Sequence, residues 1–340
     1  MSLTTIRCPK CNSENHKRHT SYTVGSGEKR EICHCKECGN YFSETKNTPL
    51  EGLRRSLSFI ILVLNAINDG MSINAACRTF GTSKKSIKRW LKRLGDLKET
   101  LLLYALCHQF LQQLVEGDEL YTKVDKNKPP AEAEGWTIVL MERASRFIWE
   151  LSCGQRDTEL FEKAMETLAQ VIEQTENLSL VTDGERRYGN LLFEICQEVV
   201  RMGQVGRPPT TLKKGVKVRV KNKGSQAHKK GPKRPKYQTP HKEHPETEQN
   251  LDNKDVHANH LEGFNSALRR LISCYRRKTN TYAKDKKPLQ KRLDAYWVLH
   301  NFVRPHFTTK QVPAVALGIL EKGFSLVELF KIQRISPAPA

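Results

Sequence analysis

The chain has 340 residues, of which 57 are lysine or arginine and 37 are aspartate or glutamate, so its formal net charge at pH 7 is +20. Such a charge is unusual for an enzyme of small-molecule metabolism and predicts binding to a polyanion. With 38% hydrophobic residues the chain can bury a core, but its longest apolar run, from Phe59 to Leu64, excludes a membrane-spanning helix of about 20 residues.

The amino-terminal residues contain no apolar stretch of the kind found in secretory signals. We therefore expect a reducing, cytoplasmic compartment, in which the ten cysteines do not form disulfides. Five of the ten lie within the first 38 residues, and this clustering indicates a metal site.

Two CxxC pairs, Cys8 with Cys11 and Cys35 with Cys38, are separated by a basic stretch rich in turn residues. This spacing is typical of a structural zinc site in which four thiolates leave no position open for water. We expect a zinc ribbon over residues 1–48, held folded largely by its metal. Four other side chains could enter the ligand set: Cys33 in place of Cys35, or His16, His19 or His34.

Residues 49–96 have the pattern of an all-α helix-turn-helix domain. An apolar segment through Phe59, Leu62, Val63 and Ala66 ends at Asp69-Gly70. Ser72 can cap a second helix that stops at Gly81, and Thr82 or Ser83 can cap a third. The third helix carries an apolar stripe of Ile87, Trp90, Leu91 and Leu94.

The opposite face of this third helix is basic. In a helix-turn-helix the last helix enters the major groove, where basic side chains meet phosphates and guanine edges. The alternative is a solvated basic face without a specific role. We expect DNA contacts from Lys84, Lys85, Lys88, Arg89 and Lys92.

A helical linker over residues 97–112 precedes a change to strand patterns, over 114–124, 136–141 and 146–152. An amphipathic helix follows at 159–174, and then a short apolar strand at 178–182. Asp118 lies inside the first of these strands, and Asp183-Gly184 follows the last. An aspartate at the end of a buried strand occupies a place where α/β proteins bind ligands.

Glu262 lies on a helix predicted over 257–273, beside an apolar stripe that includes Leu261, Phe264 and Leu268. Asn265 and Arg269 share its helix edge, where they could face a metal and a DNA backbone together. Glu248, Asp252 and Asp255 are alternative acids just upstream, but none has the same position beside a long amphipathic helix.

Asp118, Asp183 and Glu262 together have the composition of a two-metal site. Three carboxylates can hold two divalent ions about 4 Å apart, one near the attacking oxygen and one near the leaving oxygen of a phosphodiester. Magnesium prefers such oxygen ligands. Each acid alone has an ordinary explanation as a strand-edge, turn or surface residue.

A basic insertion, residues 203–256, separates Asp183 from Glu262. Between Gly203 and Glu246 there are thirteen lysines and arginines against two acids. Valines 216, 218 and 220 alternate with Lys217, Arg219 and Lys221, as in a strand with one basic face, which we expect to contact DNA. The rest is rich in proline and lysine and is either ordered against DNA or a linker without a further role.

These motifs, in this order, resemble the DDE transposases of bacterial insertion sequences, and most closely the "insertion sequence one" family. The resemblance rests on CPKC, CKECG, the helix-turn-helix, EGDEL at 116–120, TDG at 182–184 and HLEGFNSALR at 260–269. A carboxyl-terminal segment, YWVLHNFVRPH at 296–306, is similar to the closing helix of many such enzymes.

The resemblance implies a ribonuclease H-like α/β domain with a mixed sheet over residues 113–310, followed by a tail at 311–340. It implies that Asp118, Asp183 and Glu262 are catalytic and bind Mg²⁺ or Mn²⁺. It also implies two-step chemistry on double-stranded DNA, cleavage at the transposon ends and joining to a target, by a homodimer or larger assembly associated with the bacterial nucleoid. A DNA-binding regulator without activity and a nuclease of the same fold are the alternatives.

Overall fold

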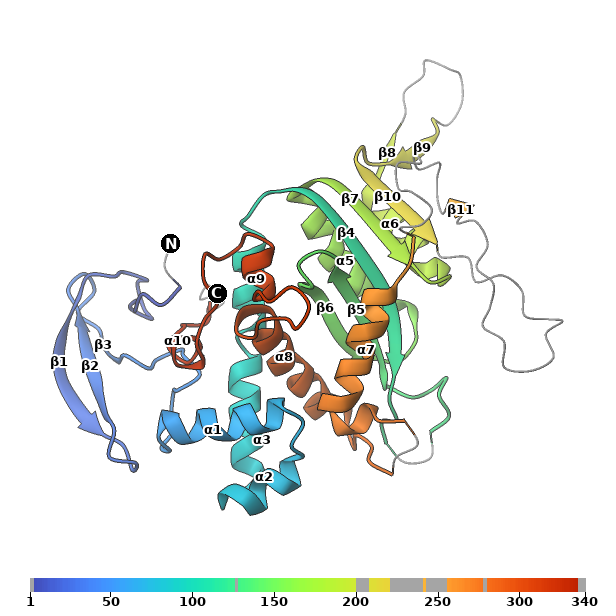
Figure 1. Ribbon diagram of the computed structural model, residues 1–340. Helices are drawn as coiled ribbons and strands as arrows, with labels where there is room; N and C mark the ends of the chain where they lie inside the picture. Colours follow the sequence, from blue (N-terminus) through green and yellow to red (C-terminus); the bar gives the residue numbers. More distant parts are fainter. Residues whose placement is uncertain are drawn as a thin grey trace. The chain divides into compact units, whose positions relative to one another are not determined.

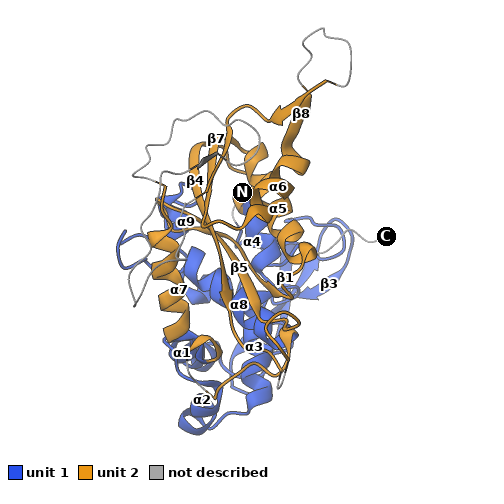
Figure 2. Cartoon of the chain, turned by 90° about the vertical axis from the view of Figure 1, so that its right-hand side faces the viewer, with its two compact units in different colours: residues 1–104, 271–273, 287–340 blue, residues 105–270, 274–286 orange. Residues whose placement is uncertain are grey.

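A computed structural model describes residues 3–125, 128–199, 208–220, 241–242, 256–277 and 280–335. The chain forms two compact units (Figure 2). Unit 1 contains residues 1–104, 271–273 and 287–340, and unit 2 contains residues 105–270 and 274–286. The first described residues of the chain therefore share a unit with the last.

Unit 1 begins with a three-stranded antiparallel sheet of β1 (His16–Thr23), β2 (Lys29–Cys35) and β3 (Tyr41–Ser43), in that order. Its small core consists of Cys8, Cys33, Cys35 and Phe42, with Ile6 and Cys38 packed against it. A core of this size stabilises a domain weakly, so a bound metal would supply much of its folding free energy.

Three helices follow, α1 (Leu57–Asn68), α2 (Ile73–Phe80) and α3 (Lys84–Gly95) (Figure 1). The side chains of Ser56, Ser72 and Ser83 each accept a hydrogen bond from a backbone N–H three residues later, which caps the helix starts. Gly81 ends α2 in the left-handed conformation, with φ +58°. Helices therefore lie where the sequence predicted the three helices of this region, with a turn at Gly81 between the last two.

The buried faces of these helices agree with the sequence prediction in α3 but not in α1. All four predicted residues of the α3 stripe are buried. In α1 the buried face is instead Ile60, Val63, Leu64 and Ile67, and Leu62 is 56% exposed. An almost continuous apolar run such as FIILVL does not reveal from periodicity alone which face turns inward.

The rest of unit 1 comes from α4 (Lys98–Ala105), α8 (Lys286–Phe302), α9 (Pro313–Ala316) and α10 (Leu326–Leu329). Arg292 of α8 donates to the Ile67 carbonyl at 3.0 Å, and Lys98 lies 5.9 Å from the Trp297 ring centroid. The final segment pairs with the ribbon, since the Arg7 backbone N–H donates to Gln333 at 2.7 Å. Residues 287–335 therefore pack with the amino-terminal module, whereas we expected those up to 310 in the α/β domain.

Unit 2 is built on a six-stranded mixed sheet with the order β11-β10-β7-β4-β5-β6. The strands are β4 (Phe110–Tyr121), β5 (Trp136–Glu142), β6 (Ile148–Gly154), β7 (Thr175–Thr182), β10 (Val216–Val220) and β11 (His241–Lys242). Strands β4, β5 and β6 are antiparallel, and β7 and β10 extend the sheet parallel to β4. This order is consistent with a ribonuclease H-like domain.

Helices lie on both faces of this sheet (Figure 1). On one face, α5 (Thr158–Glu173) packs against β5, β6 and β7, and α6 (Arg186–Cys196) packs against α5. On the other, α7 (Asn259–Leu271) is hydrogen-bonded to side chains of β4. The remaining short elements are the pair β8 (Gln197–Val199) and β9 (Thr210–Leu212), and a 3₁₀ turn, η2 (Ser273–Tyr275).

Two expected boundaries differ from the structure. The linker predicted over 97–112 is only partly helical, because α4 ends at Ala105 and β4 begins at Phe110. Residues 216–220, which we assigned to the insertion, form β10 and pair in parallel with β7. Most of the insertion, together with Glu248, Asp252 and Asp255, lies outside the described residues. No helix in the described ranges is long and apolar enough to span a membrane.

Candidate functional site

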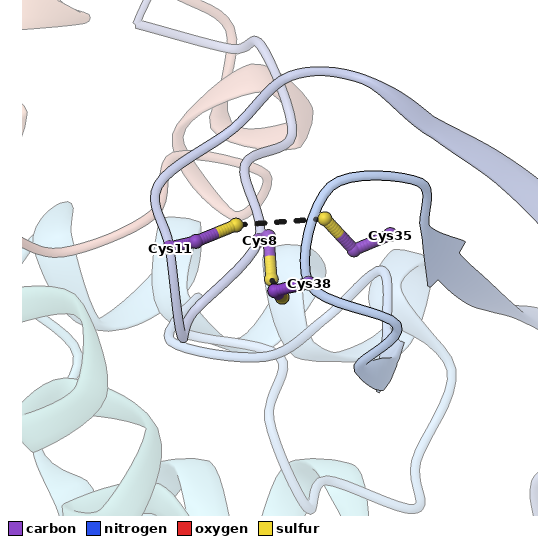
Figure 3. Close-up of side chains that lie close together, drawn as sticks. All are labelled: Cys8, Cys11, Cys35 and Cys38. Carbon is purple, nitrogen blue, oxygen red and sulfur yellow. Dashed lines mark hydrogen bonds between the residues drawn. The ribbon is translucent and has the colours of Figure 1, made fainter.

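The four predicted zinc ligands lie together at one end of the ribbon (Figure 3). The Sγ atoms of Cys8 and Cys38 are 3.6 Å apart, and those of Cys11 and Cys35 are 3.5 Å apart. A tetrahedron with Zn–S bonds of about 2.3 Å has sulfurs about 3.8 Å apart. Disulfide sulfurs are only about 2.05 Å apart, so all four are free cysteines in the geometry of a four-cysteine metal site.

Both cysteine pairs use the same backbone turn. The backbone N–H of the residue after each pair, Asn12 or Gly39, donates to the carbonyl of the first cysteine, at 2.9 and 3.1 Å. Asn12 and Gly39 both have positive φ, +60° and +69°, a conformation that asparagine and glycine tolerate best. These two turns direct the four sulfurs to one point, and Cys8–Pro–Lys–Cys11 and Cys35–Lys–Glu–Cys38 are therefore equivalent knuckles.

The other candidate ligands lie elsewhere. Cys33 is buried in the ribbon core, and burial raises the pKa of its thiol. His16 Nε2 lies 3.1 Å from the Ile6 carbonyl oxygen. His19 and His34 both pack against the Tyr41 ring. The structure thus favours Cys35 over Cys33 and brings none of the three histidines into the cluster.

The thiols of the cluster differ in acidity. Burial alone would raise the pKa of Cys8, but hydrogen bonds from the Cys11 and Lys10 backbones outweigh it and hold this pKa at about 6. A hydrogen bond from the Ser13 backbone likewise lowers the pKa of Cys11. Its contacts with the sulfurs of Cys38, Cys35 and Cys8, together with burial, outweigh that effect and raise this pKa to about 12. A zinc ion would replace the protons that these sulfurs share.

The basic face of α3 is exposed. Each of the five residues that we expected to contact DNA there is exposed: Lys84, Lys85, Lys88, Arg89 and Lys92. Lys92 Nζ is paired with Asp96 at 2.8 Å, so part of its charge is neutralised within the unit. The face has the charge and the helical position for a DNA contact.

Asp118 and Asp183 lie side by side in unit 2. Gly117 of β4 is the register partner of Thr182, the last residue of β7. Because the two strands are parallel, Asp118 follows Gly117 in the same direction as Asp183 follows Thr182. After Asp183 the backbone turns through Gly184, with φ +111°, into the start of α6 at Arg186. Asp118 accepts a hydrogen bond from Asn265 Nδ2 at 2.8 Å.

Helix α7 carries the other predicted site residues. Asn265 is buried, and its Oδ1 atom has no hydrogen-bond partner within the described parts of the chain. Glu262, one turn earlier, is exposed. Burial and the nearby Arg277 lower the pKa of Arg269, whereas the negative charge of Asp118 acts in the opposite direction. Asp118 thus has both Asn265 and Arg269 of α7 in its surroundings.

Negative charge accumulates around the ends of β4 and β7. Burial and the charges of Glu119, Asp118 and Asp183 raise the pKa of the Tyr188 phenol well above its usual value. Burial also raises the pKa of Glu119, to which Glu185 and Asp183 contribute. The carboxylates of Asp118 and Asp183 and the Oδ1 atom of Asn265 are suitable ligands for a hard divalent cation, so these residues fit Mg²⁺ or Mn²⁺. The oxygens of Asp118, Asp183 and Glu262 do not all lie within 4.8 Å of one another.

A second group close to these acids was not predicted. Glu116, His257 and His260 offer ligand atoms within 4.8 Å of one another and could also hold a metal ion. Glu116 is fully buried and forms an ion pair with Arg143 at 2.7 Å. The alternation of a strand places Glu116 on the same face as Asp118, and this is the signal in the sequence that could have identified it.

The basic strand of the insertion is only partly as expected. Lys217 of β10 is half-buried, and Arg219 is 1% exposed, so the strand does not present an open row of cations. All five residues of β10 are buried or half-buried, so both faces of the strand are largely covered. Lys221 lies outside the described residues.

No protein-family model and no curated protein matches the chain. Among solved structures, one similar chain belongs to "Crystal structure of the Mos1 Strand Transfer Complex". The two are 11% identical, and the match covers 38% of this chain and 51% of that one with a TM-score of 0.15. The match therefore spans about half the length of its solved neighbour, and a likeness at this score carries no argument about function.

Zinc content distinguishes Cys35 from Cys33 directly. Cys35→Ala should lose the single zinc ion and lower the melting temperature, because three sulfurs leave the tetrahedron incomplete. The matched variant Cys33→Ala should retain one zinc per chain and lose only about 1 kcal/mol of unfolding free energy, as for a small change in a core. Elemental analysis of purified protein measures the zinc. If Cys33→Ala lost its zinc and Cys35→Ala retained it, the proposed ligand set would be wrong.

Proposed function

We propose that this protein is a DDE-type DNA transposase that binds the ends of its element, cleaves them and joins them to target DNA. The observation that carries the proposal is the arrangement at the ends of β4 and β7. Asp118 and Asp183 are neighbours through the Gly117–Thr182 register, and the Asp118–Asn265 hydrogen bond holds the helix that carries Glu262 beside them. The finer assignment to the "insertion sequence one" family rests on sequence motifs alone.

The proposed chemistry has two steps. Water attacks a phosphodiester at each element end and releases a 3′-hydroxyl. That hydroxyl then attacks a phosphodiester of the target, forming one P–O bond as another breaks. Mg²⁺ or Mn²⁺ bound by Asp118, Asp183 and Glu262 would stabilise the charge that develops on the attacking and leaving oxygens.

The chain's own residues would orient the DNA. Asn265 lies against Asp118, and Arg269 follows one turn later on α7, where its guanidinium can pair with a backbone phosphate. In unit 1 the exposed cations of α3 are suited to duplex binding, and the zinc ribbon supports the same role. Bringing two DNA ends together requires at least two copies of the active site, so we expect a dimer or larger assembly on DNA.

The basic face of α3 can be tested by the salt dependence of binding. Lys88→Ala should weaken binding to a duplex carrying an element end and reduce the slope of log K against log salt by about 1, because one phosphate contact is lost. Lys163→Ala, which removes an exposed lysine from α5, is the matched control and should leave the slope unchanged. Fluorescence anisotropy measures both. Equal slopes for wild type and Lys88→Ala would exclude α3 as the DNA-binding face.

The catalytic proposal is tested by cleavage and strand transfer with labelled DNA carrying the ends that flank the gene. Wild type should form joined products only with Mg²⁺ or Mn²⁺. Asp183→Asn should reduce them at least about 1,000-fold, because it removes a carboxylate ligand of the metal ions that would stabilise the charge of the transition state. Glu166→Gln, at an exposed position of α5, is the control and should retain activity. Cleavage without joining would indicate a nuclease, and salt-sensitive binding without cleavage would indicate a regulator.

A further inference from the structure

Glu116 is a fully buried carboxylate of β4 whose two oxygens both accept hydrogen bonds. Oε1 accepts from Arg143 Nε at 2.7 Å and lies 2.9 Å from His260 Nδ1. Oε2 accepts from the backbone N–H of Leu261 at 2.9 Å. Burying a charge costs several kcal/mol unless it is paired and hydrogen-bonded, so this carboxylate is stable there only with these partners.

The contact with Leu261 fixes the start of α7. Leu261 is the third residue of the helix, and its N–H is one of the four at a helix start that have no partner within the helix. A carboxylate at this position satisfies that donor and interacts favourably with the positive end of the helix dipole. Glu116 therefore caps α7 from a different element of the fold.

A second contact, one helical turn later, fixes the direction of α7. Asn265 donates to Asp118, so residues 116 and 118 of β4 bind residues 261 and 265 of α7. Two residues of a strand span about 6.7 Å, and four residues of a helix span about 6 Å. The two spacings match, so the pair of contacts holds the helix in one register along the strand.

Arg143 strengthens this attachment. Its backbone N–H donates to the Leu114 carbonyl at 2.8 Å, which ties the residue to β4. Its side chain donates to Glu116 and, through Nη2, to the His257 carbonyl at 2.5 Å. Arg143 thus joins β4 to the segment that leads into α7.

A metal bound by Glu116, His257 and His260 would have to displace Arg143 from Oε1 or share that oxygen with its positive charge. Since Oε2 is also occupied, by the Leu261 N–H, neither oxygen is free for a cation. The observed hydrogen bonds are those of a structural anchor, in which the carboxylate balances one guanidinium and one helix end.

We propose that Glu116 is a positioning residue that sets the register of α7, so that Glu262 and Asn265 are presented to Asp118 and Asp183. This inference rests on the proposed function for its catalytic consequence. The anchoring of α7 itself does not depend on that function.

The test compares Glu116→Gln with Glu150→Gln in the full-length protein. The amide of Glu116→Gln keeps the shape but removes the charge and one of the two acceptor oxygens. Glu150 is a matched control because it is a buried glutamate of β6, 2% exposed, which accepts from Ser152 and from Thr167 of α5. Both variants should lower the melting temperature.

Only Glu116→Gln should affect α7. Amide hydrogen exchange over residues 259–270 should accelerate about 10-fold or more, as local opening of the helix becomes easier. The Mg²⁺ concentration for half-maximal cleavage should rise about 10- to 100-fold, the range seen when a residue that orients metal ligands is lost. Glu150→Gln should change neither quantity.

The outcomes separate the inference from the proposed function. Unchanged exchange over α7 in Glu116→Gln, or the same acceleration in Glu150→Gln, would overturn the inference. A metal-binding result could also overturn it. If wild type bound one equivalent of Mn²⁺, and both Glu116→Gln and His260→Gln lost that ion without a change in exchange, Glu116 would be a metal ligand. If wild type neither cleaves DNA nor joins it, the proposed function fails, but accelerated exchange in Glu116→Gln alone would still support the anchor.

Discussion

The parallel pairing of β4 with β7 is the constraint on which the candidate active site depends. In its register Gly117 pairs with Thr182. Because the two strands run in the same direction, Asp118 and Asp183 become neighbours where β7 ends. A shift of one residue would turn Asp118 to the opposite face of the sheet, away from α7. The buried valines and leucines of both strands oppose such a shift, because it would expose them.

The two faces of β4 have different tasks. Glu116 and Asp118 form hydrogen bonds with residues of α7. Glu119, the next residue, lies on the opposite face, where its charge helps to raise the pKa of Tyr188 in α6. Strand alternation alone produces this division. Charge is thereby concentrated near one end of the sheet, where the negative groups disfavour one another unless a cation is present. Arg156 offsets part of this electrostatic cost, since it pairs with Glu119 and Glu185 at 3.2 and 3.0 Å. A divalent metal bound by Asp118 and Asp183 would offset more of it.

Short-range features were predictable from the sequence. Paired cysteines, serine caps and glycine ends depend on a few neighbouring residues, and the knuckles at Cys8–Cys11 and Cys35–Cys38 and the caps at Ser72 and Ser83 agree with prediction. The strands of the sheet were placed within a few residues, because alternation and turn residues mark them.

Features that depend on long-range packing were not predictable in the same way. Residues 216–220 have the pattern of a strand with one basic face, but they pair with β7 within the sheet and Arg219 is buried. The carboxyl-terminal helix α8 packs in unit 1 through contacts such as Arg292 with the Ile67 carbonyl, and no local pattern specifies that partner. Strand alternation places Glu116 on the face of Asp118, but its partners Arg143 and Leu261 lie 27 and 145 residues away along the chain, so no local pattern specifies them.

The most direct test of the central claim is to locate the divalent metal. Fe²⁺ substituted for Mg²⁺ reduces added hydrogen peroxide to hydroxyl radicals, which cut the backbone near the bound ion, and mass spectrometry identifies the cuts. The account predicts cuts next to Asp118, Asp183 and Glu262, suppressed by excess Mg²⁺ and absent in Asp183→Asn. Cuts confined to the surroundings of His257 and His260, or none that Mg²⁺ suppresses, would contradict a metal site formed by the three acids.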